Sequence, residues 1–118
     1  MMPSSNSLLR YAAVMLERAA RSEKAQVWST ASQMLTAPAK NKVEINVGRL
    51  SRISQPGEAI FVPGKVLGTG ILDKKLVVGA FSFSPSARSK IETSGGSALT
   101  IESFLKKFPK GSGVKLVK

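Results

Sequence analysis

Apolar residues in the first third of the chain recur at helical spacing. One stripe runs from about Leu8 to Arg21, and a second runs from about Lys24 to Thr36. Such spacing is typical of helices that bury one face. The break between the stripes is very short. Pro38 ends the second stripe, because the residue before a proline is pushed out of the helical region. The pattern therefore predicts two helices that form a hairpin or an angled pair.

A short helix with two distinct sides is expected next. Residues 43–45 are typical of a brief extended segment, and Asn46 is suited to cap a helix from Val47 to about Ile53. At 100° per residue, the apolar side chains of this helix share one side, while Arg49 and Arg52 share the other. We therefore expect two guanidinium groups on an exposed face.

Strand patterns and turn residues dominate the middle of the chain. Residues 55–58, Gln-Pro-Gly-Glu, have the form of a type II turn. Ala59–Val62 is expected to be a strand that Pro63-Gly64 breaks and Lys65–Leu67 resumes. The near-continuous apolar run from Leu76 to Phe83 is typical of a strand that is buried on both faces.

The last third predicts two capped helices that alternate with two short strands. The first helix runs from Pro85 to about Thr93, with Ser84 as its N-cap and Gly95-Gly96 beyond its end. Thr100 is expected to cap the second helix, whose apolar side chains recur at helical spacing up to Phe108. The two strands are expected at Ala98-Leu99 and Val114–Val117.

Together these elements predict a mixed α/β fold, in which N-terminal helices are followed by irregular strand–helix units. We expect a single compact domain over residues 1–118, with a helical part at about 1–40 and a mixed strand and helix part at about 41–118. A length of 118 residues suits one domain and supports a core without covalent staples.

The composition narrows the chemistry that this chain can perform. It has no Cys and no His, and Asp73 is its one Asp. Disulfides, thiolate or imidazole metal sites and most general-base schemes are therefore excluded. We expect no enzyme activity, no cofactor, no metal and no small-molecule substrate, although a Ser–Lys dyad is left open by composition.

Charge points instead to a polyanionic partner. Lys and Arg total 18 against 7 Asp and Glu, which gives a formal net charge of +11. Residues 46–118 carry 12 basic and 4 acidic groups, a net charge of +8. No apolar run approaches the ~20 residues that span a bilayer. The N-terminus lacks the basic start of a signal peptide, so we expect a cytoplasmic protein without a membrane partner.

Three basic features each have a structural alternative. Gly64–Gly70 matches neither a Walker A loop nor a dinucleotide-binding turn, so it is expected to be a turn-rich connection in which Lys65 contacts a phosphate of a large partner. The arginines at 49 and 52 contact phosphate or pair with Glu44 and Glu58. The lysine-rich segment from residue 106 is a docked strand with projecting lysines or a frayed end.

Aromatic residues are too few to suggest a base-stacking surface. Phenylalanines lie at core spacing, and Trp28 lies on a helical stripe, where a core role is expected. No aromatic residues alternate with basic ones, as they do on sheets that stack single-stranded RNA. Contacts should therefore favour phosphates and sugars.

Five segments in this order resemble one known family. They are Glu44–Leu50, Val62–Gly70, Ala80–Ser84, Ala87–Ile91 and Lys110–Val114. Together they are similar to the archaeal form of the large-subunit ribosomal protein family L-eighteen-e, which is kin to the bacterial L-fifteen proteins. The resemblance covers nearly the whole chain. It implies a mixed α/β fold and a structural role in the large ribosomal subunit.

The resemblance also implies partners and contact residues. The partners would be large-subunit ribosomal RNA, bound through its phosphate backbone, and neighbouring ribosomal proteins, without an obligate homo-oligomer. The residues expected to bind RNA are Lys42, Asn46, Arg49, Arg52, Lys65, Lys74, Lys110 and Lys115. The alternative is a free-standing basic protein of chromatin or regulation, which would bind duplex DNA about as well as structured RNA.

Overall fold

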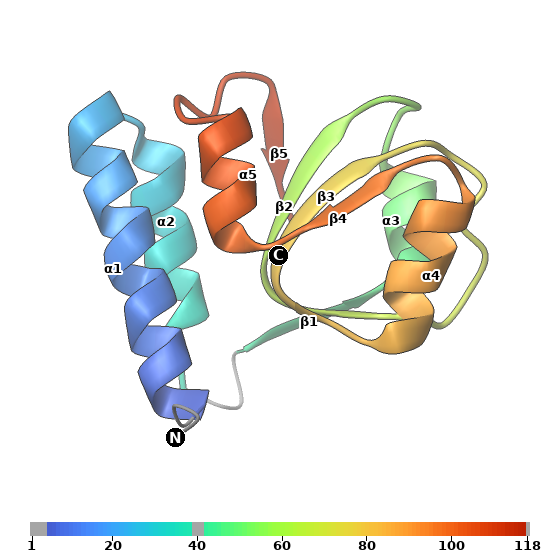
Figure 1. Cartoon of the computed structure of the whole chain (residues 1–118), viewed down its shortest axis with the longest axis horizontal. Helices are drawn as coiled ribbons and strands as arrows, with labels where there is room; N and C mark the ends of the chain where they lie inside the picture. The colour runs from blue at the N-terminus through green and yellow to red at the C-terminus, as the bar shows by residue number, and fades with distance from the viewer. Residues whose placement is uncertain (1–4, 39–41, 118) are drawn as a thin grey trace.

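The computed structural model describes residues 5–38 and 42–117, and in these it places a five-stranded sheet between two layers of helices (Figure 1). This arrangement confirms the mixed α/β fold class. In chain order the elements are α1 (Ser5–Glu23), α2 (Gln26–Leu35), β1 (Val43–Asn46), α3 (Val47–Ile53), β2 (Ala59–Leu67), β3 (Val77–Phe83), α4 (Pro85–Thr93), β4 (Ser97–Leu99), α5 (Ile101–Lys107) and β5 (Val114–Leu116).

The turn and cap residues act as the sequence predicts. The N–H of Glu58 donates to the carbonyl of Gln55 at 3.1 Å, which closes the expected turn. The hydroxyl of Ser84 accepts from the N–H of Ala87 and caps α4. The ends of the expected N-terminal part, residues 1–4 and 39–40, lie outside the described residues, as does residue 118.

The expected break at Pro63-Gly64 is wrong, because β2 continues through it. The pairing of β2 with β3 shifts register between Val62 and Lys65, so the irregularity is absorbed inside one strand. Gly64 pairs with Val43 of β1, and a Cβ on this glycine would lie 2.0 Å from the Val43 carbonyl oxygen. Glycine therefore lets β1 approach β2 at the irregular point.

All strand pairs are parallel, and the strand order is β1-β2-β3-β4, with β5 also paired to β2. Since β3 occupies one edge of β2, two strands follow one another along the other edge. β5 pairs with residues 59–61 of β2, and β1 pairs with residues 64–67. The C-terminal strand therefore lies next in line to the strand that leads into α3.

Alternate residues of the central strands face two separate hydrophobic cores. α3 and α4 cover one face, and α1, α2 and α5 cover the other (Figure 1). Buried side chains of β2 and β3 in the first core are Ile60, Val62, Val66, Val78 and Ala80. Phe61 points into the second core, where Val77 and Phe81 join it. This alternation explains why the run from 76 to 83 is almost continuously apolar.

Aromatic rings fill the second core. Trp28 has no exposed surface, and its ring lies 5.3 Å from that of Phe61 and 6.1 Å from that of Phe104, edge to face in both cases. Its indole N–H donates to the carbonyl of Pro109 at 2.8 Å. The expected core role of Trp28 is therefore confirmed, and the ring also anchors the segment that leads into β5.

Candidate nucleic-acid interface

Helix α3 exposes two arginines on the side opposite its buried face. Val47 and Leu50 are fully buried, whereas Arg49 and Arg52 are exposed. Within residues 5–38 and 42–117, neither guanidinium group has a hydrogen-bond or ion-pair partner. Ile53, expected on the buried side, is 37% exposed because the helix ends there. The two-sided pattern thus holds for the first turns of α3.

The start of α3 rests on the loop that follows β2. The backbone N–H of Gly48 donates to the carbonyl of Thr69 at 3.1 Å. A Cβ on Gly70, whose φ is +98°, would lie 2.6 Å from the Cα of Gly48. Asn46 occupies the N-cap position as expected, but its side chain makes no capping hydrogen bond. Backbone contact therefore seats this end of α3 and leaves the Asn46 amide uncommitted.

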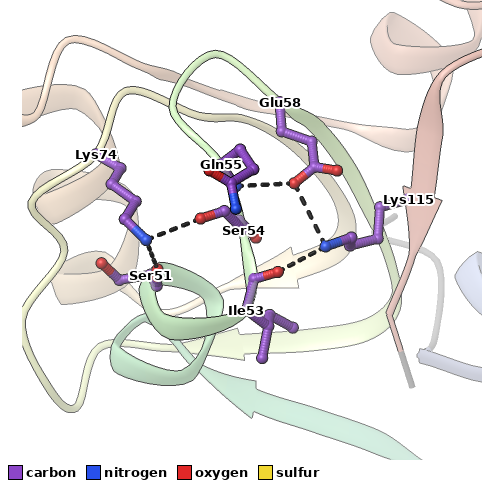
Figure 2. A network of polar contacts seen from close by, with 7 residues as sticks. All are labelled: Ser51, Ile53, Ser54, Gln55, Glu58, Lys74 and Lys115. Atoms are coloured by element: carbon purple, nitrogen blue, oxygen red, sulfur yellow. Dashed lines mark hydrogen bonds and ion pairs between the residues drawn. The ribbon is translucent and has the colours of Figure 1, made fainter.

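Lys74 holds the other end of α3 (Figure 2). Its ammonium group donates to the carbonyls of Ser51 and Ser54, the latter at 2.8 Å. A helix C-terminus leaves carbonyl groups unpaired and carries partial negative charge, so an ammonium group stabilises it. The Ser51 hydroxyl donates to Asp73 at 2.7 Å, and this hydrogen bond is the main cause that lowers the pKa of Asp73.

Lys115 of β5 reaches the same end of α3 (Figure 2). Its ammonium group donates to the carbonyl of Ile53 at 2.6 Å and forms an ion pair with Glu58 at 3.5 Å. The Glu58 carboxylate also accepts from the backbone N–H of Gln55 at 3.0 Å. The C-terminal segment is therefore docked, as one of the two sequence alternatives expected, and this lysine points to α3.

These contacts bear on the charge balance of the arginines. Glu58 pairs with Lys115 rather than with Arg49 or Arg52. Glu44 is exposed near them, yet among the described residues it forms no ion pair. The alternative in which these two carboxylates neutralise the arginines is therefore not the arrangement found.

A small hollow gathers several of the predicted residues. It has a volume of about 270 Å³ and opens to solvent. Its lining residues are Glu44, Ile45, Asn46, Gly48, Arg49, Arg52, Thr69 and Gly70. Lys90 of α4 supports one wall, because its ammonium group donates to the carbonyls of Gly68 and Gly70, the latter at 2.7 Å. Sequence analysis assigned Lys90 no role, since nothing in the local pattern links it to that loop.

The other predicted lysines lie elsewhere. Lys42 and Lys65 line a second open hollow of about 380 Å³ between α1, α2 and the strands. Lys42 also donates to the carbonyl of Leu35 at 3.1 Å, at the end of α2. Lys110 is exposed and lines neither hollow. The structure thus brings together residues 46, 49 and 52, and separates them from the lysines at positions 42, 65 and 110.

Other site classes find little in the described part of the chain. Residues 64–67 belong to β2, so the glycine-containing segment is mostly strand. In residues 5–38 and 42–117, no group of three or more acidic side chains is placed to hold a metal ion. None of the described helices is long and apolar enough to cross a bilayer.

Comparisons with known proteins agree on one family. Residues 26–99, more than half of the chain, match the family described as ribosomal proteins 50S-L15 and 50S-L18e with their 60S counterpart. The large ribosomal subunit protein eL18 of Pyrobaculum aerophilum is 41% identical over 96% of this chain and 93% of its own length. The eL18 proteins of Methanoregula boonei and Archaeoglobus fulgidus are 40% and 41% identical, over 97% and 99% of this chain and 94% and 99% of their own lengths.

Proposed function

Because the chain belongs to this family of large-subunit ribosomal proteins, we propose that it is a structural constituent of the large ribosomal subunit that binds folded ribosomal RNA through phosphate contacts. The partners are large-subunit ribosomal RNA and neighbouring ribosomal proteins. The protein acts as one domain over residues 1–118, bound to ribosomes in the cytoplasm.

The observation that carries the proposal is the state of α3. Its two arginines have no partner among the described residues, while the helix itself is held at both ends. A guanidinium group is planar, always charged and able to donate two parallel hydrogen bonds to a phosphate. Since α3 is fixed before binding, little backbone entropy is lost when RNA docks. Arg49 and Arg52 are therefore the central phosphate contacts of the proposal.

The remaining predicted residues fall into two groups. Asn46 lies beside the arginines in the hollow, and Lys42, Lys65 and Lys110 provide outer contacts around it. Lys74 and Lys115 act first by holding the end of α3, since their ammonium groups already donate to its carbonyls. The proposal thus treats the eight residues as a contact set and a supporting set.

Counterion release supplies the driving force. RNA carries a condensed layer of cations, and each protein cation that takes the place of part of that layer makes binding weaker as salt rises. A surplus of 11 positive charges on a chain of 118 residues suits this mechanism. RNA helices that otherwise repel one another can then pack against the same rigid protein.

Sedimentation of the tagged chain in an archaeal lysate tests this function. The wild-type chain should co-sediment with large subunits at low salt and leave them as ionic strength rises. The double variant Arg49→Ala/Arg52→Ala should leave at lower salt. A matched control, Arg18→Ala/Arg21→Ala on the exposed side of α1, removes the same charge and should behave like wild type. A wild-type chain that stays at the top of the gradient at low salt would overturn the proposal.

A further inference from the structure

A carboxylate lies inside the cationic hollow. Glu44 lines the same hollow as Arg49 and Arg52, and its side chain is exposed. Lys65 is its register partner across the pairing of β1 with β2, yet no ion pair joins the two. Among the described residues, the Glu44 carboxylate has no hydrogen-bond partner either. An acceptor of full negative charge is therefore presented to whatever fills the hollow.

An acid at this place conflicts with a purely electrostatic view of RNA binding. Phosphate oxygens are acceptors and repel a carboxylate, so a surface that only counted phosphates would bind more tightly without Glu44. RNA does carry donors that a carboxylate accepts from, namely the amino and imino groups of base edges and the ribose 2′-hydroxyl. The carboxylate becomes favourable only when one of these donors faces it.

The rest of the hollow suits a single nucleotide better than a helix. Its volume of about 270 Å³ is small, and two glycines, Gly48 and Gly70, lie in backbone contact in its wall. The uncommitted Asn46 amide offers both a donor and an acceptor. Base edges are free to meet such groups only where the RNA is unpaired.

We propose that this hollow receives an unpaired nucleotide of the RNA, and that Glu44 is a specificity-determining residue whose carboxylate accepts a hydrogen bond from a base edge or a 2′-hydroxyl. The inference rests on the proposed function, because the arginines that line the hollow hold the neighbouring phosphates. It adds a contact that reads RNA chemistry to contacts that only neutralise charge.

The variant Glu44→Gln gives a test by sign. It keeps the size of the side chain and removes one negative charge, so repulsion alone predicts tighter binding to transcribed archaeal large-subunit ribosomal RNA. Loss of an acceptor to a charged hydrogen bond predicts binding about tenfold weaker. The control Glu92→Gln removes the same charge from the exposed side of α4 and should bind as tightly as wild type or more tightly. Unchanged or tighter binding by Glu44→Gln would overturn the inference.

Chemical probing of the bound RNA identifies the donor. Kethoxal and dimethyl sulfate report on base edges, and acylation reports on 2′-hydroxyl groups. One unpaired nucleotide should be protected by the wild-type chain and lose that protection with Glu44→Gln. Protection that is the same for both proteins, or that changes only within a duplex, overturns the inference. The arginine variants separate this outcome from failure of the proposed function, since they test RNA binding whatever Glu44 does.

Discussion

The ammonium group of Lys115 donates to the carbonyl oxygen of Ile53 at 2.6 Å, across 62 positions of sequence (Figure 2). This contact joins the last strand to the end of the helix that presents the arginines. It exists because β5 and β1 share one edge of β2, which brings the C-terminal segment beside α3. A lysine expected from the sequence to contact RNA therefore helps to position the residues that do so in the proposed function.

Substitution of Lys115 should separate support from contact. Lys115→Met loses a charge-assisted hydrogen bond and an ion pair with Glu58, and its side chain is 37% exposed. Because solvent screens part of the loss, the free energy of unfolding should fall by about 1 kcal/mol in urea titrations. The salt dependence of RNA binding should keep its slope.

Lys110→Met is the matched control for that experiment. Lys110 is exposed and has no partner among the described residues, so the stability of this variant should be unchanged. If Lys110 contacts a phosphate, the salt slope should fall by about one. A reduced slope for Lys115→Met, with unchanged stability, would reverse the roles given to the two lysines.

Acid should weaken the anchoring of α3 through Asp73. The Ser51 hydroxyl, which donates to this carboxylate at 2.7 Å, holds the pKa of Asp73 below its ordinary value of 3.8. A lowered pKa in the folded state means that the stabilisation is present above about pH 3.8 and is lost as pH falls through the folded value. In Ser51→Ala, an NMR titration should find the pKa of Asp73 closer to 3.8. An unchanged pKa would show that the hydrogen bond is not its cause.

Much of this fold follows from local sequence signals, whereas its supporting contacts do not. Helix ends were predictable because Ser84 and Thr100 cap the N–H groups three residues later. The place of β5 was not, since strand order depends on pairing between distant segments. The roles of Lys74 and Lys115 were equally hidden, because a lysine that stabilises a helix end and a lysine that faces solvent have the same sequence signal.

RNA binding should leave the single tryptophan undisturbed. Trp28 has no exposed surface, and its ring packs against Phe61 and Phe104. Saturating RNA should therefore leave its emission maximum in place, whereas urea should shift it to longer wavelength as the core opens. A strong quench on RNA addition, without any loss of stability, would mean that a base stacks on the ring.

Close contact between Gly48 and Gly70 should be required for the hollow to form. Gly70 has a φ of +98°, and an added Cβ would lie 2.6 Å from the Cα of Gly48, so Gly70→Ala pushes α3 away from its loop. Gly57→Ala separates this contact from backbone strain, because Gly57 also has a positive φ, +83°, but nothing lies within 4 Å of its added Cβ. The control should lose roughly 1–2 kcal/mol of unfolding free energy from conformation alone.

Gly70→Ala should lose more stability than that control, and it should also bind RNA more weakly under conditions where both proteins are folded. The reason is that the position of Arg49 and Arg52 depends on how α3 is seated, whereas the turn at Gly57 precedes β2 and lies outside the hollow. Urea titration and filter binding measure the two effects. Equal losses in the two variants would mean that the glycine contact does not set the position of α3.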